Sequence, residues 1–240
     1  MPNQIRKRIS KKITKAIHDF GLIEDGDKVL IAVSGGKDSS VLLMELASRM
    51  GKFLPNCELG AIHIQSDFAD KAPRKFLEDL ALQYPQIPFF FKDVAVEARL
   101  KEGRKLNCYW CSTQRRTELI KFAREKGYNK IALGHHMDDI VETLLMNMLY
   151  KGEFSGMPPM VPYEKYPVSI IRPLCYCEES EIIEYAEDAD IKKFTCTCEF
   201  SKGSHRKSIR EEIKALTKGN STLKANLFES MRNIKMDYLL

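Results

Sequence analysis

The stretch KVLIAVSGGKDSS, residues 28–40, decides the fold class of this chain. Its first part, Lys28 to Val33, is a short apolar run rich in β-branched residues, which predicts a buried strand. Ser-Gly-Gly ends that strand, and the following VLLMEL, residues 41–46, has apolar residues at helical spacing. A strand, a glycine turn and a helix in this order predict the first unit of an α/β sheet.

The same pattern recurs along the chain and predicts an α/β fold with an open, mainly parallel sheet and helices on both faces. Further strands are predicted at Leu59–Ile64, Phe89–Val94, Lys130–Leu133 and Val168–Ile171. Helices are predicted between them at Arg74–Gln83, Gln114–Lys126 and Asp138–Tyr150. The proline-broken segment 151–167 predicts a surface loop. Beyond about residue 196 only helical patterns remain, at Ile209–Leu216 and Leu223–Met236.

We therefore expect three segments: a basic N-terminal helix (1–24), an α/β domain (25–195) and a C-terminal helical appendage (196–240). In the first helix, isoleucines at four-residue spacing form one apolar face, and basic side chains cover the other sides: Arg6, Lys7, Arg8, Lys11, Lys12 and Lys15. A second basic group follows near the C-terminus: Lys202, His205, Arg206, Lys207 and Arg210. Both groups are either solvated helix faces or surfaces that bind a phosphate backbone.

The composition bounds the class of protein. With 240 residues and 44% hydrophobic composition, the chain can bury a sizeable core. It has no apolar run approaching the roughly 18 residues that span a membrane and no secretory signal, so we expect no membrane association and a cytoplasmic location. Its net charge of +5 is too small to indicate nucleic acid by itself. Seven cysteines in a reducing compartment point to metal binding or catalysis rather than to disulfides.

The loop Ser34-Gly35-Gly36-Lys37-Asp38-Ser39 lies at the carboxyl end of the first strand, where open α/β sheets bind ligands. Paired glycines allow an anion to approach the backbone, and the serine hydroxyls, the lysine and the amides at the helix start supply donors and positive charge. A Walker A loop is excluded, because that motif needs glycine where this chain has Ile31 and Ser or Thr where it has Asp38. The pattern predicts a polyphosphate-binding loop.

Cys108 and Cys111 form a CxxC at the start of a predicted helix, where two thiolates one turn apart can bind the same metal. CxxC by itself also fits a redox dithiol, but the polar loop before it is unlike a thioredoxin strand. Two pairs are candidates for a third ligand, Cys196 with Cys198 and Cys175 with Cys177, and the first pair precedes a Gly-Ser and a basic run. Structural roles also suit three cysteines: Cys175 and Cys177 as core thiols at the end of a strand, and Cys57 as an inert one.

The phosphate loop resembles the SGGxDS motif of the PP-loop ATPases, which cleave ATP between the α and β phosphates and transfer AMP to a carbonyl oxygen. The resemblance implies a PP-loop, HUP-like fold. It also implies that ATP, with Mg²⁺ bridging its phosphates, is bound by Ser34, Gly35, Gly36, Lys37, Asp38 and Ser39. His63 resembles the family position beside adenosine, and a packed histidine at the end of a strand is the competing interpretation.

Four further motifs narrow the resemblance to the tRNA 2-thiocytidine synthetase family over nearly the whole chain. They are Cys108 and Cys111 followed by Arg115-Arg116, then LGHHMDD (133–139), GMPP (156–159) and IRPL (171–174). The family binds a 4Fe-4S cluster through three cysteines. By resemblance these are Cys108, Cys111 and Cys198, with Cys196 as a rival because the spacing here is CxC. A zinc site built from four cysteines is the structural alternative.

The resemblance also implies roles for other residues. Asp139 supports catalysis or Mg²⁺, although an acidic residue at a helix start is also favoured by the helix dipole. Gly134 lets the adenine approach the backbone, and Arg115 steadies the α-phosphate. The implied catalytic set is Asp139, Lys37, Cys108 and Cys111.

The implied activity is thiolation of a tRNA cytidine, with the C2 oxygen adenylated and then replaced by sulfur. The implied partners are tRNA and a sulfur donor such as a cysteine desulfurase, and a homodimer is compatible with the resemblance. Two alternatives stay open. One is another PP-loop enzyme that modifies tRNA or amidates its substrate, and the other is a zinc-stabilised protein that binds nucleotide or tRNA without catalysis.

Overall fold

The computed structural model describes residues 3–67, 72–100, 103, 105–163, 165–191 and 205–238. These residues form a six-stranded sheet in the order β3-β2-β1-β4-β6-β5. The strands are β1 (Lys28–Ala32), β2 (Glu58–Ser66), β3 (Phe89–Val94), β4 (Lys130–Ala132), β5 (Met160–Tyr163) and β6 (Val168–Ile171). All neighbouring pairs are parallel except β5 and β6, so the prediction of an open, mainly parallel sheet is confirmed.

The strand order explains where a ligand can enter. From β1 the chain proceeds outward to β2 and β3 on one side, and it then returns to β4 on the other side of β1. The connections that leave β1 and β4 therefore run in opposite directions, which opens a crevice at the carboxyl ends of these two strands. Residues 34–39 follow β1 directly, so the phosphate loop lies at this switch point.

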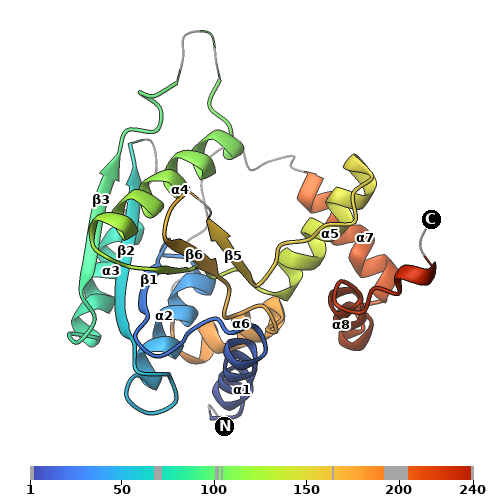
Figure 1. The fold of residues 1–240 in the computed structure, drawn as a ribbon, viewed down its shortest axis with the longest axis horizontal. Helices are drawn as coiled ribbons and strands as arrows, with labels where there is room; N and C mark the ends of the chain where they lie inside the picture. Colours follow the sequence, from blue (N-terminus) through green and yellow to red (C-terminus); the bar gives the residue numbers. More distant parts are fainter. Residues whose placement is uncertain are drawn as a thin grey trace.

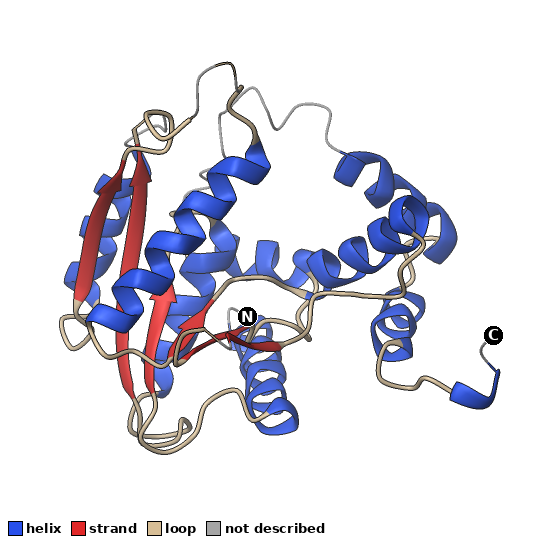
Figure 2. Cartoon of the chain, turned by 45° about the horizontal axis from the view of Figure 1, so that its top comes forward, coloured by secondary structure: helices blue, strands red, loops and turns tan. Residues whose placement is uncertain are grey.

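Helices cover both faces of the sheet, as Figures 1 and 2 show. The described helices are α1 (Asn3–Phe20), α2 (Lys37–Arg49), α3 (Ala72–Gln83), α4 (Cys108–Glu125), α5 (Met137–Lys151), α6 (Glu179–Asp188), α7 (His205–Thr217) and α8 (Ser221–Ser230). A short 3-10 helix follows at Met236–Tyr238. Successive side chains of β1 point to opposite faces of the sheet. Val29 and Ile31 pack in the core formed with α1, α2 and α6, whereas Leu30 packs in the core under α4.

Two elements were not expected from the sequence. The segment predicted as a surface loop, 151–167, contains β5, which pairs antiparallel with β6 at the sheet edge. Pro162 lies within β5, a position that an edge strand tolerates because one side of it needs no ladder hydrogen bonds. The second element is α6, which begins with a capping box between Glu178 and Glu181. The predicted C-terminal end of the helix Leu223–Met236 is wrong, because α8 ends at Ser230.

The N-terminal helix α1 packs on α6 through both its apolar and its basic face. Its isoleucines are buried, as predicted: Ile5, Ile9, Ile13 and Ile17. Ion pairs join Arg6 to Asp188 at 2.9 Å, Arg8 to Glu181 at 2.9 Å and Lys12 to Glu181 at 2.7 Å. Part of the basic face is therefore neutralised by α6, while Lys7 and Lys11 stay exposed. Of the second basic group, Lys202 lies outside the described residues.

The helices α7 and α8 pack on α5 and on each other. Ile209, Ile213 and Phe228 belong to the same hydrophobic cluster as the isoleucines of α1. No helix in the described part of the chain combines the length and apolarity needed to cross a bilayer.

Candidate active site

The phosphate loop is held in shape by its own serines. The backbone N–H of Ser34 donates to Ser39 Oγ at 3.1 Å, and the Ser39 hydroxyl donates to the Gly36 carbonyl at 3.1 Å. The Gly36 N–H donates to Ser34 Oγ at 3.3 Å, and Gly36 is the N-cap of α2. The loop therefore leads directly into the positive end of a helix, the arrangement that favours a bound phosphate.

Two glycines are required by close packing at this loop. Gly35 has φ +88°, and a Cβ added there would lie 2.5 Å from Pro73 Cβ. A Cβ at Gly134 would lie 2.9 Å from Ser39 N and 3.0 Å from the carbonyl carbon of Asp38. The loop after β4 can approach the start of α2 only because Gly134 has no side chain. This packing is a physical requirement for glycine beside the implied role of admitting adenine.

A cavity of about 340 Å³ opens beside the loop at the switch point. It contains six of the predicted ATP-binding residues among those that line it: Ser34, Asp38, Ser39, Arg115, Gly134 and Asp139. Its other lining residues include His135 from the loop after β4, and Ser112, Arg116 and Leu119 from α4. Gly35, Gly36, Lys37 and His63 are not among its lining residues. The cavity thus lies between the phosphate loop and the helix that carries the CxxC.

Lys37 is turned toward α6. Its Nζ lies 3.0 Å from Glu179 Oε1 and 3.1 Å from Asp38 Oδ1. Burial lowers the pKa of Lys37, but the two carboxylates outweigh burial and raise the pKa above its ordinary value. The lysine is therefore a charged group held between two carboxylates. Glu179 was missed by sequence reasoning because the helix that carries it was not predicted.

The histidines near the site are buried or half-buried. Nδ1 of His63 lies 2.8 Å from the Val33 carbonyl and its Nε2 lies 3.3 Å from Gln65 Oε1, so both ring nitrogens have partners within the sheet. Burial lowers the pKa of His63. Burial also lowers the pKa of His135 to about 4, and Arg172 Nε donates to its Nδ1 at 3.3 Å. Burial therefore favours the neutral form of both rings.

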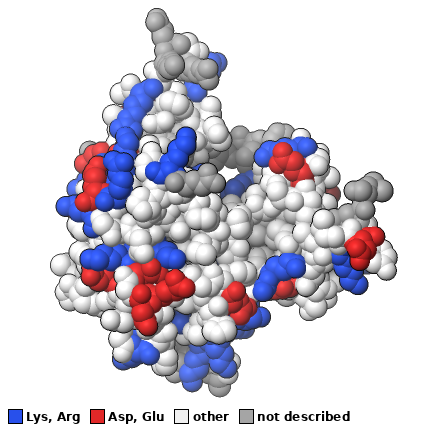
Figure 3. Space-filling model, in the orientation of Figure 1, with Lys and Arg blue, Asp and Glu red and all other residues white. Residues whose placement is uncertain are grey.

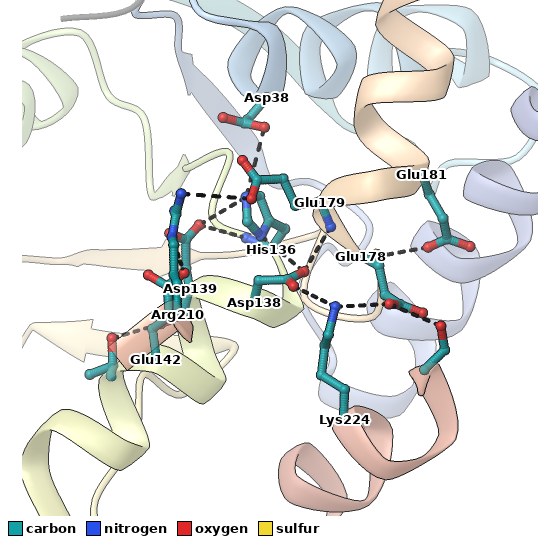
Figure 4. A network of polar contacts seen from close by, with 12 residues as sticks. Asp38, His136, Asp138, Asp139, Glu142, Glu178, Glu179, Glu181, Arg210 and Lys224 are labelled. Carbon is teal, nitrogen blue, oxygen red and sulfur yellow. Dashed lines mark hydrogen bonds and ion pairs between the residues drawn. The ribbon is translucent and has the colours of Figure 1, made fainter. Parts of the chain in front are cut away.

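A network of charges connects the site to the C-terminal helices (Figure 4). On α8, Lys224 binds Asp138 at 2.6 Å and Glu178 at 3.0 Å. On α7, Arg210 pairs with the buried Glu142 and lies 3.8 Å from Glu179. Arg206, also on α7, lies 3.9 Å from Asp139 Oδ1. These contacts join positions far apart in the chain, so no local pattern could have indicated them.

Helix α4 forms the opposite wall of the cavity and differs from this network. Ser112, Arg115, Arg116 and Leu119 line the cavity from successive turns of α4. Neither Arg115 nor Arg116 has an ion pair with any of the described residues. Figure 3 shows Lys and Arg side chains on the surface over α4. Two cations without carboxylate partners at a cavity wall are suited to bind phosphate.

The cysteines divide by their surroundings. Cys108 is exposed and Cys111 half-buried in the first turn of α4, where the Asn107 side chain accepts from the Trp110 N–H. Cys175 and Cys177 are buried, in a turn after β6 rather than at its end, and burial raises the pKa of Cys175 to about 12. Burial likewise raises the pKa of Cys57 to about 11. Burial thus favours the protonated thiol in these cysteines, which agrees with their predicted structural roles.

The further ligand candidates, Cys196 and Cys198, lie outside the described residues. Within residues 3–191 and 205–238, gaps excepted, no three His, Cys, Asp or Glu side chains are placed to hold a metal ion. The choice between Cys198 and Cys196, and between iron and zinc, is therefore still a prediction.

The GMPP motif does not line the cavity of the phosphate loop. Residues 154–159 line a second, mainly apolar cavity of about 420 Å³ together with Phe20 of α1 and Phe228 of α8. A Cβ at Gly156 would lie 2.5 Å from Met231 Sδ. Here the motif serves packing between the loop and the C-terminal helices.

The fold and the loop define the class of protein, a PP-loop protein, since residues 5–216 match the model of the PP-loop domain. A tRNA-cytidine(32) 2-sulfurtransferase of Alcanivorax borkumensis is 37% identical over 238 residues, covering 97% of this chain and 82% of the relative. The protein of that name from Tolumonas auensis is 33% identical over 242 residues, covering 99% and 80%. The chain belongs to the tRNA-cytidine(32) 2-sulfurtransferase family.

Solved structures agree on the fold. The U34-tRNA thiolase NcsA from Methanococcus maripaludis superposes with a TM-score of 0.81 at 22% identity, over 100% of this chain and 81% of that one. The NMN synthetase of Francisella tularensis superposes with a TM-score of 0.56 at 15% identity, over 97% and 93%. Both likenesses concern the arrangement of strands and helices.

Proposed function

We propose that the protein is an ATP-dependent tRNA sulfurtransferase that replaces the C2 oxygen of cytidine with sulfur, at position 32 as in the names of its relatives. The observation that carries the proposal is the shared cavity, which has the phosphate loop on one wall and the CxxC helix α4 on the other. Adenylation acts on the cytidine O2 and sulfur delivery on the C2 atom that carries this oxygen, so the groups for both steps have to meet at one cavity.

The phosphate loop and α4 bind ATP. Backbone amides and hydroxyls of residues 34–39 contact the leaving pyrophosphate, and Lys37 exchanges a carboxylate partner for a phosphate oxygen. Arg115 contacts the α-phosphate from the other wall. Gly134 lies beside the adenine, and a contact of His63 with the nucleoside stays a prediction.

The residues present fit the cofactors that the family implies. Asp38 and Asp139 both line the cavity, and carboxylate oxygens are the ligands Mg²⁺ prefers, so these two residues would hold Mg²⁺. Cys108 and Cys111, together with Cys198, would hold a 4Fe-4S cluster, the group with which NcsA was solved. Such a cluster, with three cysteine ligands, would supply an iron without a fourth protein ligand for the sulfur that is transferred.

The protein's side chains position the substrates and stabilise charge in two successive steps. The cytidine O2 attacks the α-phosphorus of ATP and pyrophosphate leaves, while Arg115 and Lys37 neutralise charge that develops on the phosphates. Hydrosulfide sulfur next attacks C2, and AMP leaves with the original oxygen. The two steps give thiolated tRNA, AMP and pyrophosphate. The protein's contribution is positioning and electrostatics.

The sulfur donor, the location and the assembly complete the proposal. A cysteine desulfurase or an equivalent carrier supplies the sulfur, and the enzyme acts in the cytoplasm where its tRNA substrate is found. The chemistry proposed above needs one chain, and a homodimer is compatible with it.

Nucleoside mass spectrometry of tRNA from cells with and without the gene tests the proposal. We expect 2-thiocytidine to disappear on deletion and to return with the wild-type gene. The purified protein, with ATP, tRNA and a sulfide source, should release AMP and pyrophosphate in a tRNA-dependent manner. Unchanged 2-thiocytidine, or nucleotide binding without pyrophosphate release, would favour the zinc-stabilised binding protein. Pyrophosphate release with a different modified product would favour another PP-loop enzyme.

A further inference from the structure

Two adjacent aromatic residues between the CxxC cysteines have opposite surroundings. Trp110 is half-buried, and its indole N–H donates to the Val96 carbonyl at 3.2 Å. Tyr109 is 81% exposed, and the described residues provide no partner for its side chain. Trp110 therefore anchors the first turn of α4 to the segment that follows β3, whereas packing among the described residues does not explain the large aromatic ring of Tyr109.

The position of Tyr109 on α4 relates it to the cavity. On a helix with 3.6 residues per turn, Tyr109, Ser112 and Arg116 lie along one side, at spacings of three and four residues. Ser112 and Arg116 line the cavity. Tyr109 thus continues the cavity-lining side of α4 outward by one turn, beside the exposed Cys108.

A nucleobase is the ligand that suits this position. The reacting base has to reach both the phosphates of ATP and the sulfur held at the first turn of α4, so it must pass the residues of that turn. Taking a base out of its stack in RNA costs free energy, and proteins compensate by stacking it on an exposed aromatic ring. Arg115 and Arg116, which lack carboxylate partners among the described residues, supply the positive charge that an RNA backbone needs.

We infer that the ring of Tyr109 is a stacking platform for an unpaired tRNA base at the mouth of the active site. The inference rests on the proposed function and deepens it by naming a residue that selects single-stranded, unstacked substrate. Since the contact is made by the face of the ring, the phenol hydroxyl is dispensable and phenylalanine can replace tyrosine.

Three variants test this inference: Tyr109→Ala, Tyr109→Phe and, as a control, Phe53→Ala. Phe53 is 73% exposed in the turn after α2, at the end of that helix opposite the phosphate loop. We expect Tyr109→Ala to raise KM for tRNA by about 10-fold, with iron content and KM for ATP unchanged. Tyr109→Phe and Phe53→Ala should both stay within about two-fold of wild type.

A direct readout uses an anticodon stem-loop with the fluorescent base pyrrolocytidine at the target position. Stacking should quench its fluorescence with wild type and Tyr109→Phe, and less with Tyr109→Ala. Equal KM for tRNA in wild type and Tyr109→Ala would overturn the inference, and so would a loss in Tyr109→Phe as large as in Tyr109→Ala. Loss of iron in Tyr109→Ala would assign the residue to the metal site instead. Failure of the wild type to thiolate tRNA would contradict the proposed function itself, and is thus distinguishable.

Discussion

The two sides of the cavity differ in whether their cationic side chains have carboxylate partners. On the side of the phosphate loop the cations do not line the cavity themselves and have carboxylate partners: Lys37 has Asp38 and Glu179, and Lys224 has Asp138. On the α4 wall, Arg115 and Arg116 face the same cavity without an ion pair to any described residue. Paired charges hold a site in one geometry before substrate arrives, whereas unpaired cations gain most from a bound anion.

The difference indicates a division of labour. The wall of α2, α5 and α6 is braced by α7 and α8 through the charge network, and its phosphate loop is held by hydrogen bonds of its own serines. The wall of α4 has exposed side chains in its first turn, including Cys108 and Tyr109. We therefore expect the first wall to determine nucleotide chemistry and the second to determine binding of tRNA and sulfur delivery.

The largest effects should separate the two walls completely. Lys37→Ala should lower tRNA-dependent pyrophosphate release by about 100-fold or more while iron content stays at the wild-type level, because the lysine stabilises phosphate charge. Cys108→Ala should lose the iron and the thiolation activity while ATP binding persists. Lys52→Ala, an exposed lysine beyond the far end of α2, is the control. Pyrophosphate release, nucleoside analysis and iron content are measured on anaerobically prepared protein.

The outcomes that contradict this separation are specific. Loss of iron in Lys37→Ala would mean that the two walls depend on each other for folding. Stoichiometric zinc without iron after anaerobic reconstitution would replace the cluster by a structural zinc site. Release of ADP and orthophosphate by the wild type would contradict cleavage between the α and β phosphates.

A smaller effect is expected from the unpaired arginines. Arg115→Ala should raise KM for ATP by about 10-fold, the size of a missing charge-assisted hydrogen bond. The control is Arg124→Ala on the same helix, whose guanidinium lies 5.7 Å from the Tyr166 ring centre and away from the cavity. Steady-state kinetics with saturating tRNA measures the difference. Equal KM values in the two variants would show that the α4 wall does not bind phosphate.

The ion pairs that Lys224 of α8 makes should contribute to the free energy of unfolding. Lys224→Met should lower the free energy of unfolding by about 1 kcal/mol, measured by urea denaturation at pH 7. Burial lowers the pKa of Lys224, but Asp138 and Glu178 outweigh it and raise the pKa. Burial raises the pKa of Asp138, but Lys224 and the Glu179 N–H outweigh it and lower the pKa.

These directions set the pH dependence of that difference. The contribution of Lys224 is present below its unfolded pKa and is lost as pH rises through the higher folded value. The contribution of Asp138 is present above its unfolded pKa and is lost as pH falls through the lower folded value. The stability gap between wild type and Lys224→Met should therefore be constant near neutrality and narrow at both extremes. A gap independent of pH would contradict a role for this ion pair.

The smallest effect concerns the same contrast between paired and unpaired cations on the N-terminal helix. Lys7→Ala with Lys11→Ala should flatten the salt dependence of tRNA binding by about 0.7–0.9 for each phosphate that the helix no longer neutralises. Replacement of Arg8 and Lys12, which already pair with α6, should change the slope less. Binding is measured from low to physiological salt. Equal slopes for wild type and the Lys7/Lys11 variant would leave the basic residues after Cys198 as the surface to test.

Local patterns predicted the parallel strands of the sheet and the positions in the chain of the phosphate loop and of the CxxC, while the chemistry assigned to these residues stays a prediction. The run at Lys28–Val33 predicted a central strand because burial on both faces requires apolar residues throughout. The glycines and serines after it predicted the phosphate loop, and the CxxC was correctly placed at the start of a helix. Edge strand β5 was missed because it contains a proline, which argues against a strand. Helix α6 was missed because its sequence is short and highly charged.

The sequence by itself determined the α/β class, the phosphate loop and the position of the first two cysteines, because each depends on neighbours within a few residues. Only the tertiary structure decided which groups meet. It paired Lys37 with Glu179, brought Arg206 to Asp139, joined Lys224 to Asp138 and set Arg115 opposite the phosphate loop. Such contacts follow from strand order and helix packing, which bring residues many positions apart in the chain within ion-pair distance. They produce no periodic pattern in the local sequence, so they could not be predicted from it.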